Sequence, residues 1–200
     1  MVGHTFIYSA PVRRIKEIIK AGDIGQVQYI ASRRLNLGLF QTDVNVIWDL
    51  AVHDLAIMDY VLGQTPAAVS AEGMSHVARA PENVAYLTLF FDTDLIAHIH
   101  VNWLAPVKVR RTLIGGSKKM IVYDDLEPSE KVKVYDKGVE VTNGRGLYEL
   151  LVSYRSGDMW APKVEQTEAL RTELAYFMHC ILKDETPFND GRAAVRVVRL

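Results

Sequence analysis

The stretch from Asn45 to Asp54 holds the densest group of side chains that can do chemistry. Asp49 and His53 stand four residues apart, so on a helix they lie about 40° apart around the axis and share one face. A carboxylate in that position can orient the imidazole and favour its charged form. Such an imidazole can take a proton from an alcohol, or return one to a ketone, near neutral pH. The alternative is a surface ion pair or a contact that only stabilises the helix.

Four further side chains are candidates for substrate contacts near this pair. Asn45 falls one turn earlier on the same face, and Trp48 stands where an indole can wall a pocket. Arg34 and Asn36 end the preceding predicted strand and alternate onto one of its faces. Arginine suits phosphate or carboxylate groups, and asparagine suits sugar hydroxyls. The competing interpretation of these two residues is an exposed strand end.

Other candidate motifs are weaker. His98 and His100 share one strand face and could bind a metal with a third ligand, but histidines packed at a sheet contact explain them better, and we expect no metal site. Cys180 lies in an apolar helical segment and is expected in the core. Neither a G-x-G-x-x-G after a strand nor a G-x-x-x-x-G-K-[ST] loop occurs, so both common nucleotide-binding fingerprints are missing from the sequence.

Two predicted elements must position the site. Apolar residues at helical spacing predict a helix from Val46 to Leu62, which Gly63 ends. Val27, Tyr29 and the apolar residues after them predict a strand from Gln26 to Leu35. The site therefore belongs where this strand leads through a loop into the helix.

The remaining sequence predicts the fold class. From Ala67 to Tyr154 we expect mostly strands with short turns, because turn signals such as Gly115-Gly116 and Lys137-Gly138 separate apolar runs. Connections this short exclude parallel crossovers, so the sheet should be largely antiparallel. With helices before and after it, this predicts an α+β domain, an open sheet with helices on one face. The other sheet face, if apolar, needs a partner.

The two ends of the chain complete this prediction. We expect a strand at Thr5–Tyr8, then a helix after Ser9 with Pro11 in its first turn. A closing helix is predicted from Val164 to Lys183, and Asp190 is placed to cap a last one.

Composition limits the possible functions. The chain has 200 residues, 49% of them hydrophobic, and a formal net charge of −1, so a role on nucleic acid or a membrane surface has no electrostatic support. No apolar run approaches the roughly 20 residues that span a bilayer, and no secretory signal begins the sequence. One cysteine fits a reducing compartment, and we expect the cytoplasm.

Three stretches together resemble the C-terminal part of Gfo/Idh/MocA-type oxidoreductases. They are the segment from Gly3 to Arg13 with the Gly22–Gly25 turn, the Trp48–Leu55 helix, and the segment from Pro187 to Gly191. Their order and spacing extend the resemblance over nearly the whole chain. The stretches Asn36–Phe40 and Asp49–Asp54 most resemble members that act on nucleotide-linked sugars.

The resemblance implies an enzyme of which this chain is a part. It implies a glyceraldehyde-3-phosphate dehydrogenase-like C-terminal domain, with residues 10–200 as the substrate-binding and oligomerisation domain and residues 1–9 as the last strand or linker of a nucleotide-binding domain. That other domain would hold most of an NAD or NADP cofactor, with Tyr8 near its cleft. The substrate would be a sugar, nucleotide sugar or polyol. His53 would be the acid/base, and Asp49 would orient it or bind substrate.

Two other interpretations stay open at this point. The chain can be a stand-alone, non-catalytic module that dimerises through its sheet and senses a ligand. It can also be a metal hydrolase that uses His98 and His100 with Asp49 or His53.

Overall fold

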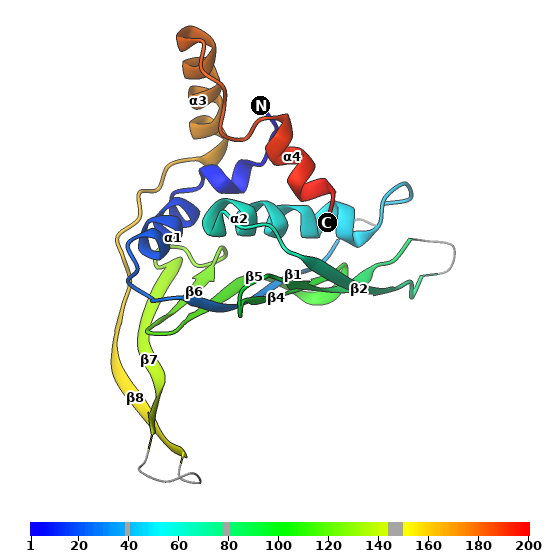
Figure 1. Ribbon diagram of the computed structural model, residues 1–200. Helices are drawn as coiled ribbons and strands as arrows, with labels where there is room; N and C mark the ends of the chain where they lie inside the picture. The colour runs from blue at the N-terminus through cyan, green and yellow to red at the C-terminus, as the bar shows by residue number, and fades with distance from the viewer. Residues whose placement is uncertain (39–40, 78–80, 144–149) are drawn as a thin grey trace.

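In the computed structural model, which describes residues 1–38, 41–77, 81–143 and 150–200, one sheet carries helices on one of its faces (Figure 1). Leu39 and Phe40, which end the nucleotide-sugar-like stretch, lie outside the described residues. The eight strands are β1 (Val27–Leu37), β2 (Ala68–Met74), β3 (Val84–Phe90), β4 (Ile96–Asn102), β5 (Leu104–Gly116), β6 (Met120–Asp124), β7 (Val132–Asn143) and β8 (Leu150–Trp160).

The strand order is β2-β3-β4-β1-β5-β6-β7-β8. Every neighbouring pair is antiparallel except β1 and β4, which run parallel with Arg33 beside His100. Because the β2-β3-β4 meander returns to the edge of β1 instead of continuing from it, β1 comes to lie in the middle of the sheet. The α+β class and the largely antiparallel open sheet are confirmed.

The helices form the second layer. They are α1 (Ala10–Lys20), α2 (Val52–Leu62), α3 (Ala169–Lys183) and α4 (Gly191–Val198), with a 3-10 turn η1 (Thr5–Tyr8) and a π-helical turn η2 (Ile47–Ala51). Helix α1 buries Val12, Ile15 and Ile18 almost completely, as its apolar spacing predicts. Gly63 ends α2 at φ 63°, a left-handed conformation that glycine adopts without steric cost.

Three local predictions are wrong. Thr5–Tyr8 is the turn η1 and not a strand, because Ile7 and Tyr8 are both buried, whereas a half-buried strand would alternate. Lys137-Gly138 lies inside β7, where a register shift between Tyr135 and Lys137 absorbs the predicted turn. Helix α3 begins at Ala169, five residues after the predicted start at Val164.

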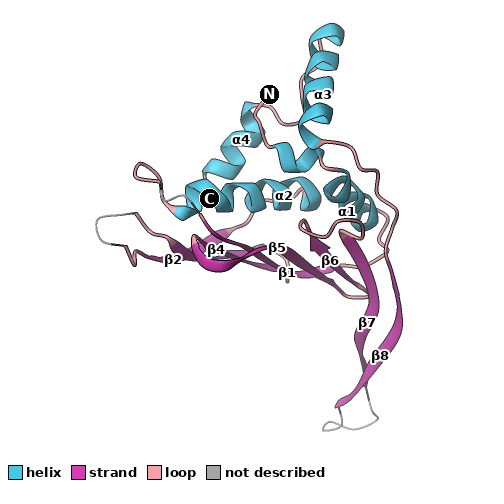
Figure 2. Cartoon of the chain, turned by 180° about the vertical axis from the view of Figure 1, so that it is seen from behind, coloured by secondary structure: helices cyan, strands magenta, loops and turns pink. Residues whose placement is uncertain are grey.

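The two faces of the sheet differ. Buried side chains of alternate strand residues, such as Ile30, Leu87 and Ile99, lie under the helices. The face turned away from the helices is uncovered in Figure 2 and exposes Tyr86, Phe90, Ile96 and Val107 among others. We call this uncovered side the open face.

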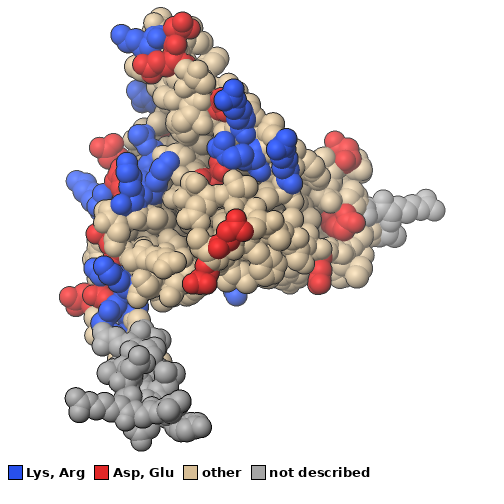
Figure 3. All heavy atoms as spheres, in the orientation of Figure 1, with Lys and Arg blue, Asp and Glu red and all other residues tan. Residues whose placement is uncertain are grey.

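Two parts extend from the two-layered body. The β7–β8 hairpin continues past the other strands, and α3 rises away from the sheet (Figure 1). Acidic and basic side chains are interspersed over the side shown in Figure 3, in keeping with the net charge of −1. Among the described residues, no helix is both long and apolar enough to cross a membrane.

Candidate active site

Asn45 caps the helical segment that carries Asp49 and His53. The Asn45 side-chain oxygen accepts the backbone N–H groups of Ile47 and Trp48, each at 3.2 Å, and its amide donates to Glu82 at 3.2 Å. An asparagine in this position satisfies N–H groups that the first turn leaves without partners. The structure therefore uses the predicted substrate contact Asn45 as a helix cap. The predicted single α-helix is instead the π-helical turn η2 followed by α2. Single π-helical turns of this kind occur frequently at functional sites.

Asp49 contacts a different group from the one predicted. Its Oδ2 accepts the indole N–H of Trp103 at 2.8 Å, and Trp103 is fully buried between β4 and β5. Among the described residues, no hydrogen bond joins Asp49 to His53. The carboxylate is thus fixed by the sheet and acts on the imidazole through its charge.

His53 is partly buried beneath the N-terminal segment. Its ring meets the Phe6 ring edge-on, with centroids 5.1 Å apart. Burial, followed by the nearby Arg34 guanidinium, lowers the pKa of His53 below 6.5, although Asp54 and Asp49 oppose this. Asp49 does favour the charged imidazole, as predicted, but desolvation outweighs the two acids and sets the net direction of the pKa shift. A neutral, partly exposed imidazole can accept a proton.

Arg34 points under the helices and not into open solvent. Its Nε donates to Asp54 Oδ2 at 2.6 Å and its terminal nitrogen to Asp54 Oδ1 at 3.3 Å, with 5% and 4% of the two side chains exposed. Ser32 Oγ also donates to Asp54 at 2.8 Å and lies 3.0 Å from the Thr112 hydroxyl. The structure therefore ties the predicted substrate residue Arg34 into a buried network.

Asp54 is a residue of this site that the sequence prediction did not single out. Its signal was present, because a charged residue among Leu55, Ala56 and Ile57 on a buried helix needs a partner. Arg34 stood on the core-facing side of β1, two residues from Ser32, and was the available cation.

The other predicted residues lie in three different surroundings. Asn36 is partly buried and lies close to Gly38. A Cβ atom added at Gly38 would lie 2.8 Å from Asn36 Nδ2 and 3.1 Å from the ring of Trp103, the residue that binds Asp49. Asn36 and Trp103 therefore both border Gly38. Trp48 is 55% exposed and lines a small apolar hollow with Val52 and the end of α4. Neither Asp49 nor His53 lines this hollow.

Tyr8 lies in the core. Only 4% of it is exposed, and its hydroxyl donates to Asn189 Oδ1 at 2.7 Å. Burial accordingly raises the pKa of the phenol. The side chain assigned to the cofactor cleft thus serves the packing between the N-terminal segment and the loop before α4.

His98 and His100 lie on the open face, where His100 stacks on Tyr86 at 4.3 Å between centroids and His98 contacts the Thr88 hydroxyl at 3.0 Å. Asp49 and His53 lie on the helix-covered side, so the sheet separates the two groups. The metal-hydrolase interpretation is therefore wrong in its geometry. Within the described part of the chain, no three acidic, histidine or cysteine side chains gather as metal ligands.

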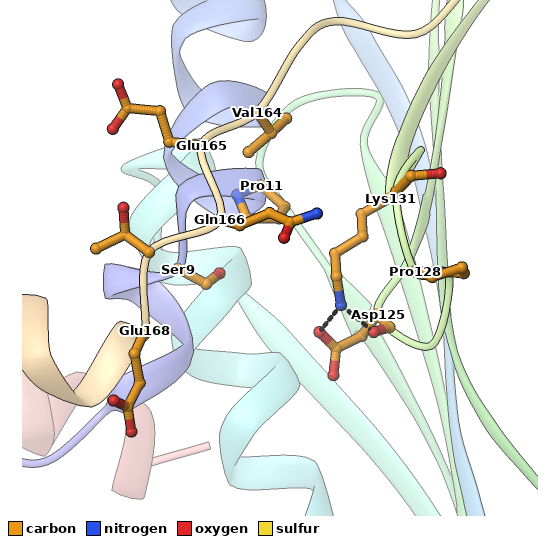
Figure 4. Close-up of a pocket in the computed structure, with 11 residues that line it drawn as sticks. Ser9, Pro11, Asp125, Pro128, Lys131, Val164, Glu165, Gln166 and Glu168 are labelled. Carbon is orange, nitrogen blue, oxygen red and sulfur yellow. Dashed lines mark hydrogen bonds and ion pairs between the residues drawn. The ribbon is translucent and has the colours of Figure 1, made fainter.

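A larger cavity, about 390 Å³, lies apart from these residues (Figure 4). It is bounded by the start of α1, the turn between β6 and β7, and the segment 164–168. Its one lysine, Lys131, is held by the carbonyl and carboxylate oxygens of Asp125. None of the predicted site residues lines it, so cavity size does not mark the same place as the acid/base chemistry.

Comparison with known proteins gives one family match. The model of the GFO/IDH/MocA C-terminal domain matches residues 12–122. No curated protein matches the chain.

Solved structures share the fold at low identity. UDP-N-acetylglucosamine 3-dehydrogenase from Acidithiobacillus ferrooxidans has a TM-score of 0.72 at 24% identity, covering 98% of this chain and 57% of its own. Aldose-aldose oxidoreductase from Caulobacter crescentus has a TM-score of 0.77 at 15% identity, covering 100% and 58%. Levoglucosan dehydrogenase, in complex with NADH and levoglucosan, has a TM-score of 0.70 at 14% identity, covering 98% and 60%. The chain thus spans less than two thirds of the length of each.

Proposed function

The chain belongs to the GFO/IDH/MocA family, because the model of that family's C-terminal domain matches it. We propose that the chain is the substrate-binding half of an NAD(P)-dependent oxidoreductase. The proposed substrate is the hydroxyl of a sugar, a nucleotide-linked sugar or a polyol. The structurally similar proteins named above, which act on an aldose, on levoglucosan and on a UDP-linked sugar, support this class.

His53 carries the proposed chemistry. A partly exposed imidazole with a lowered pKa is neutral near pH 7, so it can accept the proton of a substrate hydroxyl during oxidation and return it during reduction. The proposal rests on one geometric observation: a partly exposed imidazole in the first turn of α2, one helical turn after Asp49. Asn36 and Asp49 are proposed to contact the sugar, since both lie beside Trp103 on the helix-covered side.

The side chain that the sequence assigned to the cofactor does not fit that role. Tyr8, the one side chain assigned to the cofactor, is buried and hydrogen bonded within the fold. We therefore place the cofactor on a separate nucleotide-binding domain and assign no step through it to this chain. The length of the similar enzymes supports a further domain, because this chain spans only 57–60% of them.

Helix α3 offers a surface for that domain. One side of it exposes apolar residues where it rises from the body: Leu170, Leu174, Phe177, Met178, Ile181 and Leu182. Exposed apolar stripes of this kind mark contact surfaces. We also propose that residues 1–9 link the chain to that domain and that residues 10–200 form the substrate-binding domain. The linker contains the helical turn η1 and not the expected strand.

The open face is proposed to pair with a second copy of the chain. Tyr86, Phe90 and Ile96 are each 44% exposed on it, an aromatic and apolar composition typical of interface centres. Because the helices cover only one face of the sheet, the apolar residues of the open face need a partner to cover them.

The test is the turnover of the complete enzyme with His53→Ala. We expect a fall in kcat of at least about 100-fold, since general acid–base catalysis contributes about 10²–10⁴-fold, with little change in the unfolding midpoint. His179→Gln, an exposed histidine on α3, is the matched control and should keep normal turnover. Near-normal turnover of His53→Ala across pH would show that another group moves the proton.

A further inference from the structure

A buried ion pair joins Arg34 on β1 to Asp54, the residue that directly follows His53 in the chain. Both side chains are at least 95% buried, and the guanidinium makes two hydrogen bonds to the carboxylate. Asp54 is the neighbour of His53 in the first turn of α2. Both charges therefore lie close enough to His53 to act on its imidazole.

Stability alone does not explain this pair. The cost of removing two charges from water cancels most or all of their attraction, and apolar residues of similar volume often stabilise a fold more. A buried pair is better explained where it holds a neighbouring group in place. The neighbour here is the Phe6 ring.

Phe6 connects the pair to the imidazole. The Arg34 guanidinium carbon lies 4.6 Å from the centroid of the Phe6 ring, a cation–π distance. The same ring meets His53 edge-on at 5.1 Å. A chain of three contacts therefore links Asp54 to Arg34, Arg34 to the Phe6 ring, and the Phe6 ring to the His53 imidazole.

We propose that Arg34, Asp54 and Phe6 are positioning residues for His53: the buried ion pair holds Phe6, and Phe6 holds the imidazole in the orientation that transfers the proton. This inference rests on the proposed role of His53. It assigns the three residues no contact with substrate.

The charges around His53 give this arrangement a measurable signature. Arg34 on β1 and His4 in the N-terminal segment lower the pKa of His53, whereas Asp54 on α2 and Asp49 on η2 raise it. Replacing one member of the ion pair leaves the other acting alone. Asp54→Asn should therefore lower the pKa of His53 further, and Arg34→Gln should raise it.

The experiment is an NMR titration of the His53 ring in the 200-residue chain, from about pH 5 to 8, the range in which histidine titrates. Opposite shifts in the two variants are the expected result. A far-ultraviolet circular dichroism spectrum that matches the unaltered chain is the control for a global change in each variant. Shifts of the same sign, or none, in folded variants would overturn the inference.

Phe6→Leu tests the inference without removing a buried charge, should either charge variant fail to fold. In the complete enzyme we expect about a tenfold fall in kcat with KM nearly unchanged, because only the orientation of the base is lost. Normal kcat would overturn the positioning role. The proposed function fails separately, if His53→Ala keeps its turnover while the two charge variants still shift the titration of His53 in opposite directions.

Discussion

Removing Asp54 should destabilise the chain far more than removing both members of its ion pair. In Asp54→Leu the Arg34 guanidinium, 5% exposed, loses a partner at 2.6 Å and at 3.3 Å and stays under the helices with its charge. Leaving one buried charge without its partner costs about 3–5 kcal/mol. For a chain of this size that corresponds to a fall of about 6–20 °C in the melting temperature.

The double variant Arg34→Met with Asp54→Leu removes both charges and keeps the volume. We expect its stability to lie within about 1 kcal/mol of the natural chain, because the desolvation cost disappears together with the attraction. Ser32 keeps a hydroxyl partner in Thr112, so the double variant creates no lone polar group there. The summed losses of the single variants should therefore exceed the loss in the double variant by at least about 2 kcal/mol.

Urea unfolding followed by tryptophan fluorescence measures these differences, because Trp103 is fully buried in the folded state. Circular dichroism of the same samples checks that helix and sheet unfold together. A loss under about 0.5 kcal/mol in Asp54→Leu would refute the reasoning, since it would mean that water reaches the guanidinium. The reasoning would also be refuted if the double variant lost as much unfolding free energy as the two single variants together.

Three further predictions follow from single contacts. Asn45→Ala removes the cap of η2 and should cost about 1 kcal/mol in urea unfolding; Asn45→Ser, which keeps an acceptor and sets no second carboxylate beside Glu82, should cost less. Ile96→Lys on the open face should lower the mass seen by light scattering if two copies pair there, and an unchanged mass would contradict the pairing. Burial lowers the pKa of His53 and of His4 below 6.5, so the unfolded chain takes up protons first as the pH falls. The melting temperature should therefore drop between pH 7 and about pH 5, and a constant value would show that both imidazoles protonate freely in the fold.

Local patterns alone determined the layers of this protein. The spacing of Val12, Ile15 and Ile18 needs no distant partner to define an apolar helix face, and Gly63 marks the end of α2 by its own backbone freedom. Asp190 caps α4 through N–H groups only two and three residues away. The antiparallel hairpin of β3 and β4, which turns between Phe90 and Ile96, is equally local, so the α+β class and the antiparallel meander could be predicted from the sequence.

Tertiary structure decided the partners of the site residues. Asp49 binds Trp103, which is 54 positions away, and Arg34 binds Asp54 across the boundary between sheet and helices. The parallel pairing of β1 with β4 likewise depends on where a whole meander returns. Spacing along a helix shows which residues share a face, but it does not show what the opposite layer presents to that face. The same limit explains the pKa of His53, because its burial under Phe6 outweighs the two acids that the sequence places beside it.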